Sequence, residues 1–180
     1  MAAFLTQLGE AFVGTGPEAA HVNTALGAKG GPVETAWVTA LATPREGHVA
    51  FVVAAQPGLA VKPMTLFVNK ATIASDAHAQ LTWGPAQAGV ASGVLDALVD
   101  GTVAPASVDE LVLVVAVWVA PAASDPDAVY RFNRAATRDS LRAGALRQPS
   151  VGDVLSVRDE PFNAHWLPPT MRRSDERSTG

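Results

Sequence analysis

Residues 111–120, LVLVVAVWVA, form the longest apolar run of the chain and decide the kind of fold it adopts. Apolar side chains occupy every position, so both faces of an extended strand would be buried. The run is too short for a membrane-spanning helix, which needs about 20 apolar residues. The sequence therefore predicts a strand at the centre of a β-sheet.

Segments with strand and helix signals alternate around this run. Pro32 stands near the start of one helical pattern and Gly101 follows the end of another, as is common at helix termini. Asp125 is a capping residue for a third helix. We predict a single α/β (α+β) domain in which helices pack on a mixed β-sheet. The predicted strands are 4–13, 20–26, 48–56, 65–73 and 111–120, and the predicted helices are 33–42, 84–101 and 124–146.

The C-terminal part of the chain carries weaker patterns. From about Arg147 the periodicity fades, and the last ten residues, MRRSDERSTG, have the composition of a disordered tail. The predicted organisation is a folded domain over 1–146, an extension over 147–170 and a disordered tail over 171–180.

Composition excludes several classes of function. The 180 residues are 48% hydrophobic and 17% charged, with a net charge of -4, and Lys and Arg cluster only near the C-terminus. This balance argues against binding to nucleic acid or to an anionic membrane surface. The absence of cysteine excludes disulfides, thiolate metal sites and thiol catalysis. The N-terminus lacks the regions of a signal peptide, so a soluble cytoplasmic protein is expected.

Two predicted strands each place a pair of polar side chains on one face. Side chains alternate along a strand, so His21 shares a face with Asn23, and Lys70 shares one with Thr72. If these faces converge, the site holds an imidazole, an amide, an amine and a hydroxyl. An imidazole is a natural proton donor at neutral pH, since its ordinary pKa is about 6.5. A lone histidine on a strand is more often structural, and a lysine on a sheet face is ordinary.

Gln87 is a further candidate, because it follows Pro85 at the predicted start of a helix, where backbone N–H groups point outward. The simpler interpretation is that this segment is only a helix start. The other histidines, His48, His78 and His165, lack the spacing of metal ligands, so no metal site is predicted.

Several segments carry a recognisable combination of motifs. They are 9–27 (GEAFVGTGPEAAHVNTALG), 31–37 (GPVETAW), 62–73 (KPMTLFVNKATI) and 84–101 (GPAQAGVASGVLDALVDG), with a weaker one at 130–140 (YRFNRAATRDS). Taken together, these segments resemble the formaldehyde-activating enzymes of one-carbon metabolism. The similarity runs from about Gln7 to Ala143.

The resemblance implies a fold, a reaction and a set of site residues. Members of the family condense formaldehyde with tetrahydromethanopterin to methylene-tetrahydromethanopterin and water. They are metal-free cytoplasmic homopentamers without a tightly bound cofactor. Their α/β fold is like the second domain of ribosomal protein S5, and the pterin binds between subunits. By position, the family's proton donor falls on His21, and its pterin-contacting residues fall on Asn23, Val52, Lys70, Thr72 and Gln87.

Asn23 is the main departure from the family pattern, which usually has aspartate at this position. A carboxylate beside a histidine favours the protonated imidazole, whereas asparagine is neutral and both donates and accepts hydrogen bonds. Three interpretations stay open. The chain is a formaldehyde-condensing enzyme with His21 as general acid, a non-catalytic pterin-binding carrier or sensor, or an enzyme with another activity on a related ligand.

Overall fold

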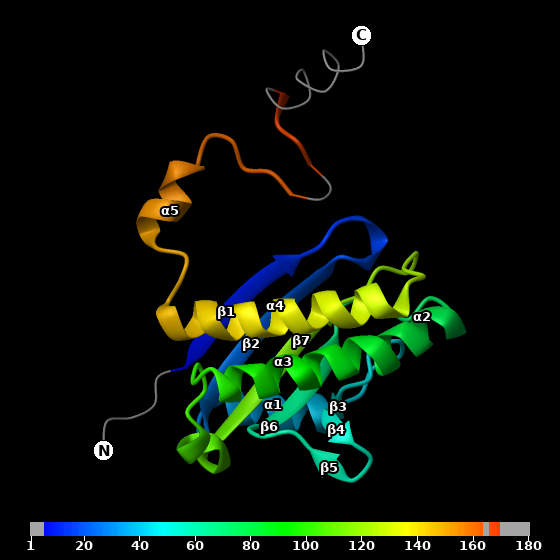
Figure 1. The fold of residues 1–180 in the computed structure, drawn as a ribbon, viewed down its shortest axis with the longest axis vertical. Helices are drawn as coiled ribbons and strands as arrows, with labels where there is room; N and C mark the ends of the chain where they lie inside the picture. The colour runs from blue at the N-terminus through cyan, green and yellow to red at the C-terminus, as the bar shows by residue number, and fades with distance from the viewer. Residues whose placement is uncertain (1–5, 164–165, 170–180) are drawn as a thin grey trace. The chain divides into compact units, whose positions relative to one another are not determined.

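The computed structural model of the chain describes residues 6–163 and 166–169. Its contacts divide the chain into two units, Met1–Gln148 and Pro149–Gly180. The first unit is built on a mixed five-stranded sheet, in the order β1-β2-β7-β6-β3 (Figure 1). Its strands are β1 (Gln7–Val13), β2 (Ala20–Ala28), β3 (Phe51–Val52), β6 (Met64–Asn69) and β7 (Leu111–Trp118).

β7 is the middle strand of the sheet, which confirms the prediction from its apolar sequence. It pairs antiparallel with β2 and parallel with β6. Its alternate residues Leu113, Val115 and Val117 are completely buried. Because strands flank β7 on both edges, each backbone polar group along it has a neighbouring strand to bond with.

Two helices, α3 (Gln87–Val99) and α4 (Pro126–Leu146), lie side by side across one face of the sheet (Figure 1). The Asp125 side chain caps α4 by accepting hydrogen bonds from two backbone N–H groups of its first turn, as predicted. Gly101, with a φ of 80°, follows the end of α3, where its freedom to adopt a left-handed conformation lets the chain turn away.

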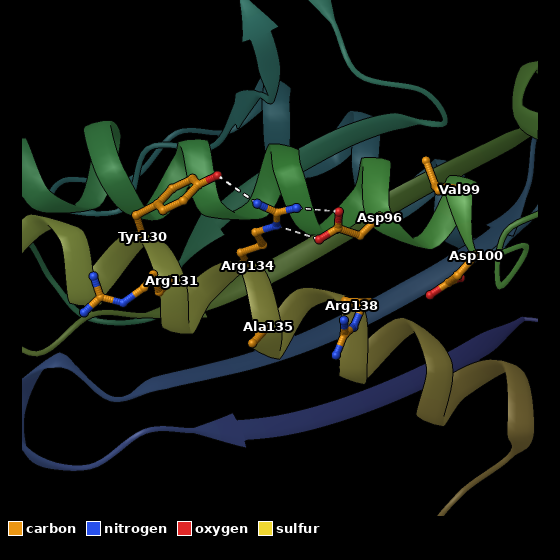
Figure 2. A pocket seen from close by; sticks show the side chains of 8 residues that line it. All are labelled: Asp96, Val99, Asp100, Tyr130, Arg131, Arg134, Ala135 and Arg138. Atoms are coloured by element: carbon orange, nitrogen blue, oxygen red, sulfur yellow. Dashed lines mark hydrogen bonds and ion pairs between the residues drawn. The ribbon is translucent and has the colours of Figure 1, made fainter.

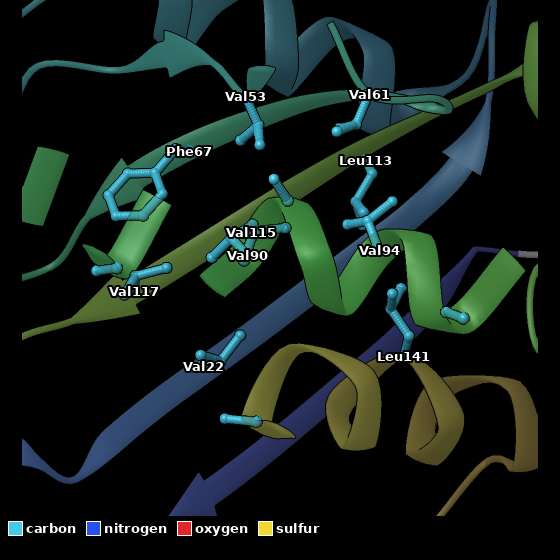
Figure 3. Close-up of a cluster of buried hydrophobic side chains, with 14 of the residues drawn as sticks. Val22, Val53, Val61, Phe67, Val90, Val94, Leu113, Val115, Val117 and Leu141 are labelled. Carbon is cyan, nitrogen blue, oxygen red and sulfur yellow. The ribbon is translucent and has the colours of Figure 1, made fainter. Parts of the chain in front are cut away.

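The hydrophobic core lies between these two helices and the sheet (Figure 3). Val90 and Val94 of α3 and Phe67 of β6 are completely buried there. Burial of each such side chain contributes roughly 1.5–3 kcal/mol to folding. This core holds α3 and α4 against one face only, so the opposite face is free to present other groups.

The opposite face is covered at one end by α1 (Pro32–Ala42), a helix that begins at a proline as predicted. A Cβ at Gly27 of β2 would lie 2.5 Å from Val33 Cγ2, so the glycine allows close approach of the helix. Gly27 shares a face with His21 and Asn23, because all three are odd-numbered residues of one strand. At the other end of β2, His21 and Asn23 themselves remain partly exposed.

Segment 48–56 is not one continuous strand, contrary to the prediction. β3 pairs with β6, whereas β4 (Ala54–Gln56) pairs with β5 (Leu59–Ala60) in a separate two-stranded sheet. The two parts are divided at Val53, whose side chain is completely buried. The apolar composition of 48–56 correctly indicated extended structure. It did not show that the two halves of the segment pair with different strands.

The strand predicted over 65–73 ends early, at Asn69. The Asn69 side-chain amide donates to two backbone carbonyls outside the strand, each at 2.8 Å. Lys70 and Thr72 therefore follow β6 instead of alternating along it. Placing both on one strand face was wrong, because hydrogen bonds from Asn69 direct the chain away from the sheet.

The helix predicted over 84–101 is the second half of a longer helical segment. α2 (Asp76–Leu81) leads into one π-helical turn over 82–86, and α3 continues from there. Pro85 consequently lies inside the helical segment instead of in its first turn. The prediction that Gln87 sits beside unpaired N-terminal donors is wrong, because the turn before it is already helical.

The second unit contains α5 (Val151–Ser156), which begins with a capping box formed by Ser150 and Asp153. The predicted tail over 171–180 and His165 lie outside the described residues. No helix in the described part of the chain is both long and apolar enough to cross a membrane.

Candidate functional site

The β1–β2 hairpin positions His21 beside a carboxylate. Glu10 of β1 stands opposite Asn23, and Phe12 stands opposite His21. Glu10 reaches diagonally across the hairpin, so its Oε1 lies 3.0 Å from His21 Nε2. The His21 side chain is 38% exposed, which leaves the paired imidazole accessible from solvent. This arrangement holds a proton-transfer group in place on an open sheet face.

Asn23 and Lys70 are joined by a hydrogen bond across the sheet. The Lys70 Nζ donates to Asn23 Oδ1 at 2.8 Å, although β7 lies between β2, which carries Asn23, and β6, which Lys70 follows. Partial burial lowers the pKa of the Lys70 amine, and the nearby Glu10 carboxylate opposes this shift. The structure thus brings His21, Asn23 and Lys70 together, and adds Glu10 to them.

Thr72 is held by a histidine instead of by this cluster. Its hydroxyl lies 2.9 Å from His48 Nε2, and His48 Nδ1 lies 3.0 Å from the backbone oxygen of Asn69. A carbonyl oxygen only accepts, so in the neutral ring Nδ1 carries the proton and Nε2 accepts from Thr72. His48 therefore orients the hydroxyl of Thr72, which is an exposed residue.

Val52 and Gln87 meet in a pocket of about 370 Å³ that is also lined by Phe51 and Trp83. Gln87 Nε2 donates to the backbone oxygen of Ala54 at 3.2 Å, whereas Gln87 Oε1 is buried and without a partner among the described residues. An unpaired buried acceptor costs roughly 1–3 kcal/mol. Apolar walls with one free acceptor suit a flat heterocycle that carries an N–H donor.

By their contacts, the candidate residues fall into three groups: the His21–Asn23–Lys70 cluster, the Thr72–His48 pair and the Val52–Gln87 pocket. The described residues contain no group of three or more His, Cys, Asp or Glu side chains arranged to hold a metal ion.

Sequence reasoning missed several residues of these groups, among them Glu10, His48 and Trp83. Glu10 carried a usable signal, since the short connection between two predicted strands implies a hairpin in which β1 faces β2. His48 and Trp83 carried none, because their contacts depend on loops and on an unpredicted helical segment.

A further pocket, of about 430 Å³, lies between α3 and α4 (Figure 2). Of the arginines that line it, Arg134 bonds the Asp96 carboxylate through Nε at 2.6 Å and Nη2 at 2.8 Å. This bidentate contact lowers the pKa of Asp96. None of the predicted site residues lines the pocket. The pair links the two helices that cover the core.

Comparison with known proteins adds to this geometry. A family model described as formaldehyde-activating enzyme (Fae) matches residues 8–165, a span that continues beyond Ala143, where the resemblance was expected to end. A 5,6,7,8-tetrahydromethanopterin hydro-lyase from Methanosarcina barkeri is 39% identical over 154 residues, which is 86% of each chain.

Two longer relatives carry the name bifunctional enzyme Fae/Hps. The protein from Methanothrix thermoacetophila is 38% identical over 148 residues, 82% of this chain and 38% of the relative. The protein from Methanosphaera stadtmanae is 37% identical over 174 residues, 92% of this chain and 43% of the relative. The chain thus spans less than half the length of these bifunctional relatives.

Proposed function

Because the chain belongs to the formaldehyde-activating enzyme family, we propose that it condenses formaldehyde with tetrahydromethanopterin to give methylene-tetrahydromethanopterin and water. The observation that carries this proposal is the pairing of His21 with Glu10 at 3.0 Å on an accessible sheet face. The Glu10 carboxylate accepts a hydrogen bond from Nε2–H of the protonated imidazole and so orients the proton donor. Glu10 thereby places a negative charge beside His21, which the neutral side chain of Asn23 cannot provide.

The proposed reaction needs one proton donor and good orientation. An amine attacks formaldehyde to form a carbinolamine, and the His21 imidazolium protonates the departing hydroxyl as general acid. Water leaves, and the second pterin amine closes the resulting iminium. The pterin is a substrate and no tightly bound cofactor takes part. Orientation of the amines and the aldehyde supplies the rest of the acceleration.

The Val52–Gln87 pocket is the proposed seat of the pterin ring. The unpaired Gln87 Oε1 is a suitable acceptor for a ring N–H, and Trp83 and Phe51 offer flat surfaces. We expect Gln87→Leu to raise the KM for tetrahydromethanopterin about tenfold, equivalent to about 1.4 kcal/mol, because the hydrogen bond is lost. Steady-state kinetics at varied pterin concentration measures this, and a fall in kcat with unchanged KM would contradict a binding role.

We further propose that the chain forms a homo-oligomer, a homopentamer as in the family it belongs to, with pterin sites completed between subunits. Exposed apolar side chains support this proposal: Phe12 is 51% exposed and Val38 on α1 is 53% exposed.

Asn23 favours a second candidate function, a non-catalytic pterin-binding carrier or sensor. Its neutral amide occupies the position where the resemblance places a carboxylate, and Lys70 is engaged with it. In that case the protein would bind the pterin without accelerating the condensation.

A rate measurement separates the two functions. Methylene-tetrahydromethanopterin formation is followed with and without the purified protein, and we expect acceleration. We also expect Asn23→Asp to give no gain in rate, because Glu10 already provides the charge beside His21. An inactive parent protein with a large gain in Asn23→Asp would instead establish the non-catalytic function.

A further inference from the structure

We infer that Lys70 captures formaldehyde covalently, through attack of its neutral amine on the aldehyde carbon. The site of this capture is the cluster of Lys70, Asn23, His21 and Glu10 on the open end of the sheet face. The inference deepens the proposed function and rests on it for the identity of the aldehyde. It assigns the first carbon–nitrogen bond of the reaction to the protein instead of to the pterin.

The hydrogen bond to Asn23 is the first support. An amide oxygen accepts a hydrogen bond from a neutral amine as well as from an ammonium group. Unlike a carboxylate, it brings no full negative charge that would favour the protonated form. Among the described residues, Lys70 forms no ion pair with a carboxylate, whereas Lys62 is paired with Asp109. A neutral partner therefore holds the Lys70 amine in position while its lone pair remains available.

The surroundings of the amine are the second support. Lys70 is half-buried, and desolvation lowers the pKa of its amine, as in lysines that form Schiff bases with carbonyl substrates. Glu10 acts against this effect from a distance, but it is itself in contact with His21. In this cluster the Glu10 carboxylate therefore contacts the His21 imidazole, and the neutral Asn23 amide contacts the Lys70 amine.

The position of His21 is the third support. Asn23 and His21 are two residues apart on one strand face, a separation of about 6.6 Å. A hydroxymethyl group on Lys70 Nζ, which is anchored at Asn23, has to extend along this interval for its hydroxyl to reach His21. His21 is then the neighbouring acid for the departing hydroxyl.

The chemical step balances without any further reactant. The Lys70 amine adds to formaldehyde, and one N–H proton moves to the former carbonyl oxygen to give Nζ–CH2OH. Protonation of this hydroxyl by His21 releases water and leaves a methylene iminium on Nζ. A pterin amine adds to the methylene carbon, and the proton of that amine moves to Nζ. Expulsion of the neutral lysine then leaves the methylene iminium on the pterin. The second pterin amine then closes the ring and its proton returns to His21.

The chain offers an internal comparison for testing this capture, because it has three lysines, Lys29, Lys62 and Lys70. The whole protein is treated with 13C-formaldehyde and cyanoborohydride near neutral pH, without pterin, at low extents of labelling. Reduction of an iminium leaves a methyl group, and peptides from a protease that does not cleave at lysine show where it resides. We expect Lys70 to be labelled at least about tenfold faster than Lys29 or Lys62, because desolvation lowers the pKa of its amine and its hydrogen-bond partner is neutral. Labelling of Lys70 no faster than the other two would overturn the inference.

Asn23→Asp tests the role of the neutral partner. A carboxylate in place of the amide favours the ammonium form of Lys70, so its labelling is expected to slow about tenfold while that of Lys29 and Lys62 stays unchanged. Gln56→Glu makes the same change of charge at an exposed position of the β4–β5 hairpin and is the matched control. Equal labelling of Lys70 in both variants and the parent would contradict the inference.

The rate of condensation, measured beside the labelling, distinguishes a failure of the capture by Lys70 from a failure of the proposed function. Lys70→Arg retains a cation and a hydrogen-bond donor but has no amine for capture, so we expect the catalysed rate to be lost. A parent protein that accelerates condensation without selective labelling of Lys70 would overturn only the capture. Selective labelling in a protein that does not accelerate condensation would support the capture and refute the proposed function.

Discussion

His21→Ala is expected to lower kcat for condensation by about 10²- to 10⁴-fold, the usual contribution of a positioned general acid. The imidazole is held at 3.0 Å from Glu10 and is accessible, so its removal takes away the proton donor without emptying a buried site. The measurement is the rate of methylene-tetrahydromethanopterin formation after subtraction of the uncatalysed reaction.

Glu10→Gln is the graded control for this loss. It removes the negative charge but keeps a hydrogen-bonding oxygen near His21, which still orients the imidazole, so a smaller fall in kcat than in His21→Ala is expected. Both residues are partly exposed, and unchanged circular dichroism would show that neither change disturbs the fold. An active His21→Ala protein would refute the assignment of the proton donor.

Gly9→Ala is expected to reduce the free energy of unfolding by about 3 kcal/mol or more, at the upper end of the cost of overpacking. A Cβ at Gly9 would lie 1.8 Å from the backbone oxygen of Ser140 in α4. Backbone cannot rotate aside as a side chain does, so the helix has to move from β1. That movement would also disturb the buried hydrogen bond between the Thr24 and Ser140 hydroxyls, which are 2.8 Å apart.

Denaturant unfolding of Gly9→Ala beside Gly84→Ala measures this effect. No atom lies within 4 Å of a Cβ added at Gly84, so the second variant makes the same chemical change without the clash. We expect a lower midpoint for Gly9→Ala and little change for Gly84→Ala. Equal midpoints would mean that α4 is not seated as closely on β1 as the structure has it.

Elements with a strong local pattern were predictable from the sequence. The all-apolar run at 111–120 became the central strand, and Asp125 capped the helix that follows it. Segment 48–56 was misjudged because its apolar composition carries no information about which strand each half pairs with. The helix before Gln87 was missed because Gly84 and Pro85, residues typical of a helix boundary, lie inside one continuous helical segment.

The sequence by itself determined that His21 and Asn23 share a strand face, since alternation of side chains is a property of one strand. It also determined the family, through motifs spread along the chain. Only the tertiary structure decided that Glu10 pairs with His21 and that Asn23 meets Lys70 across β7. The physical reason is that periodicity acts within one element, whereas strand register, sheet order and the course of the chain after Asn69 depend on the packing of all elements together.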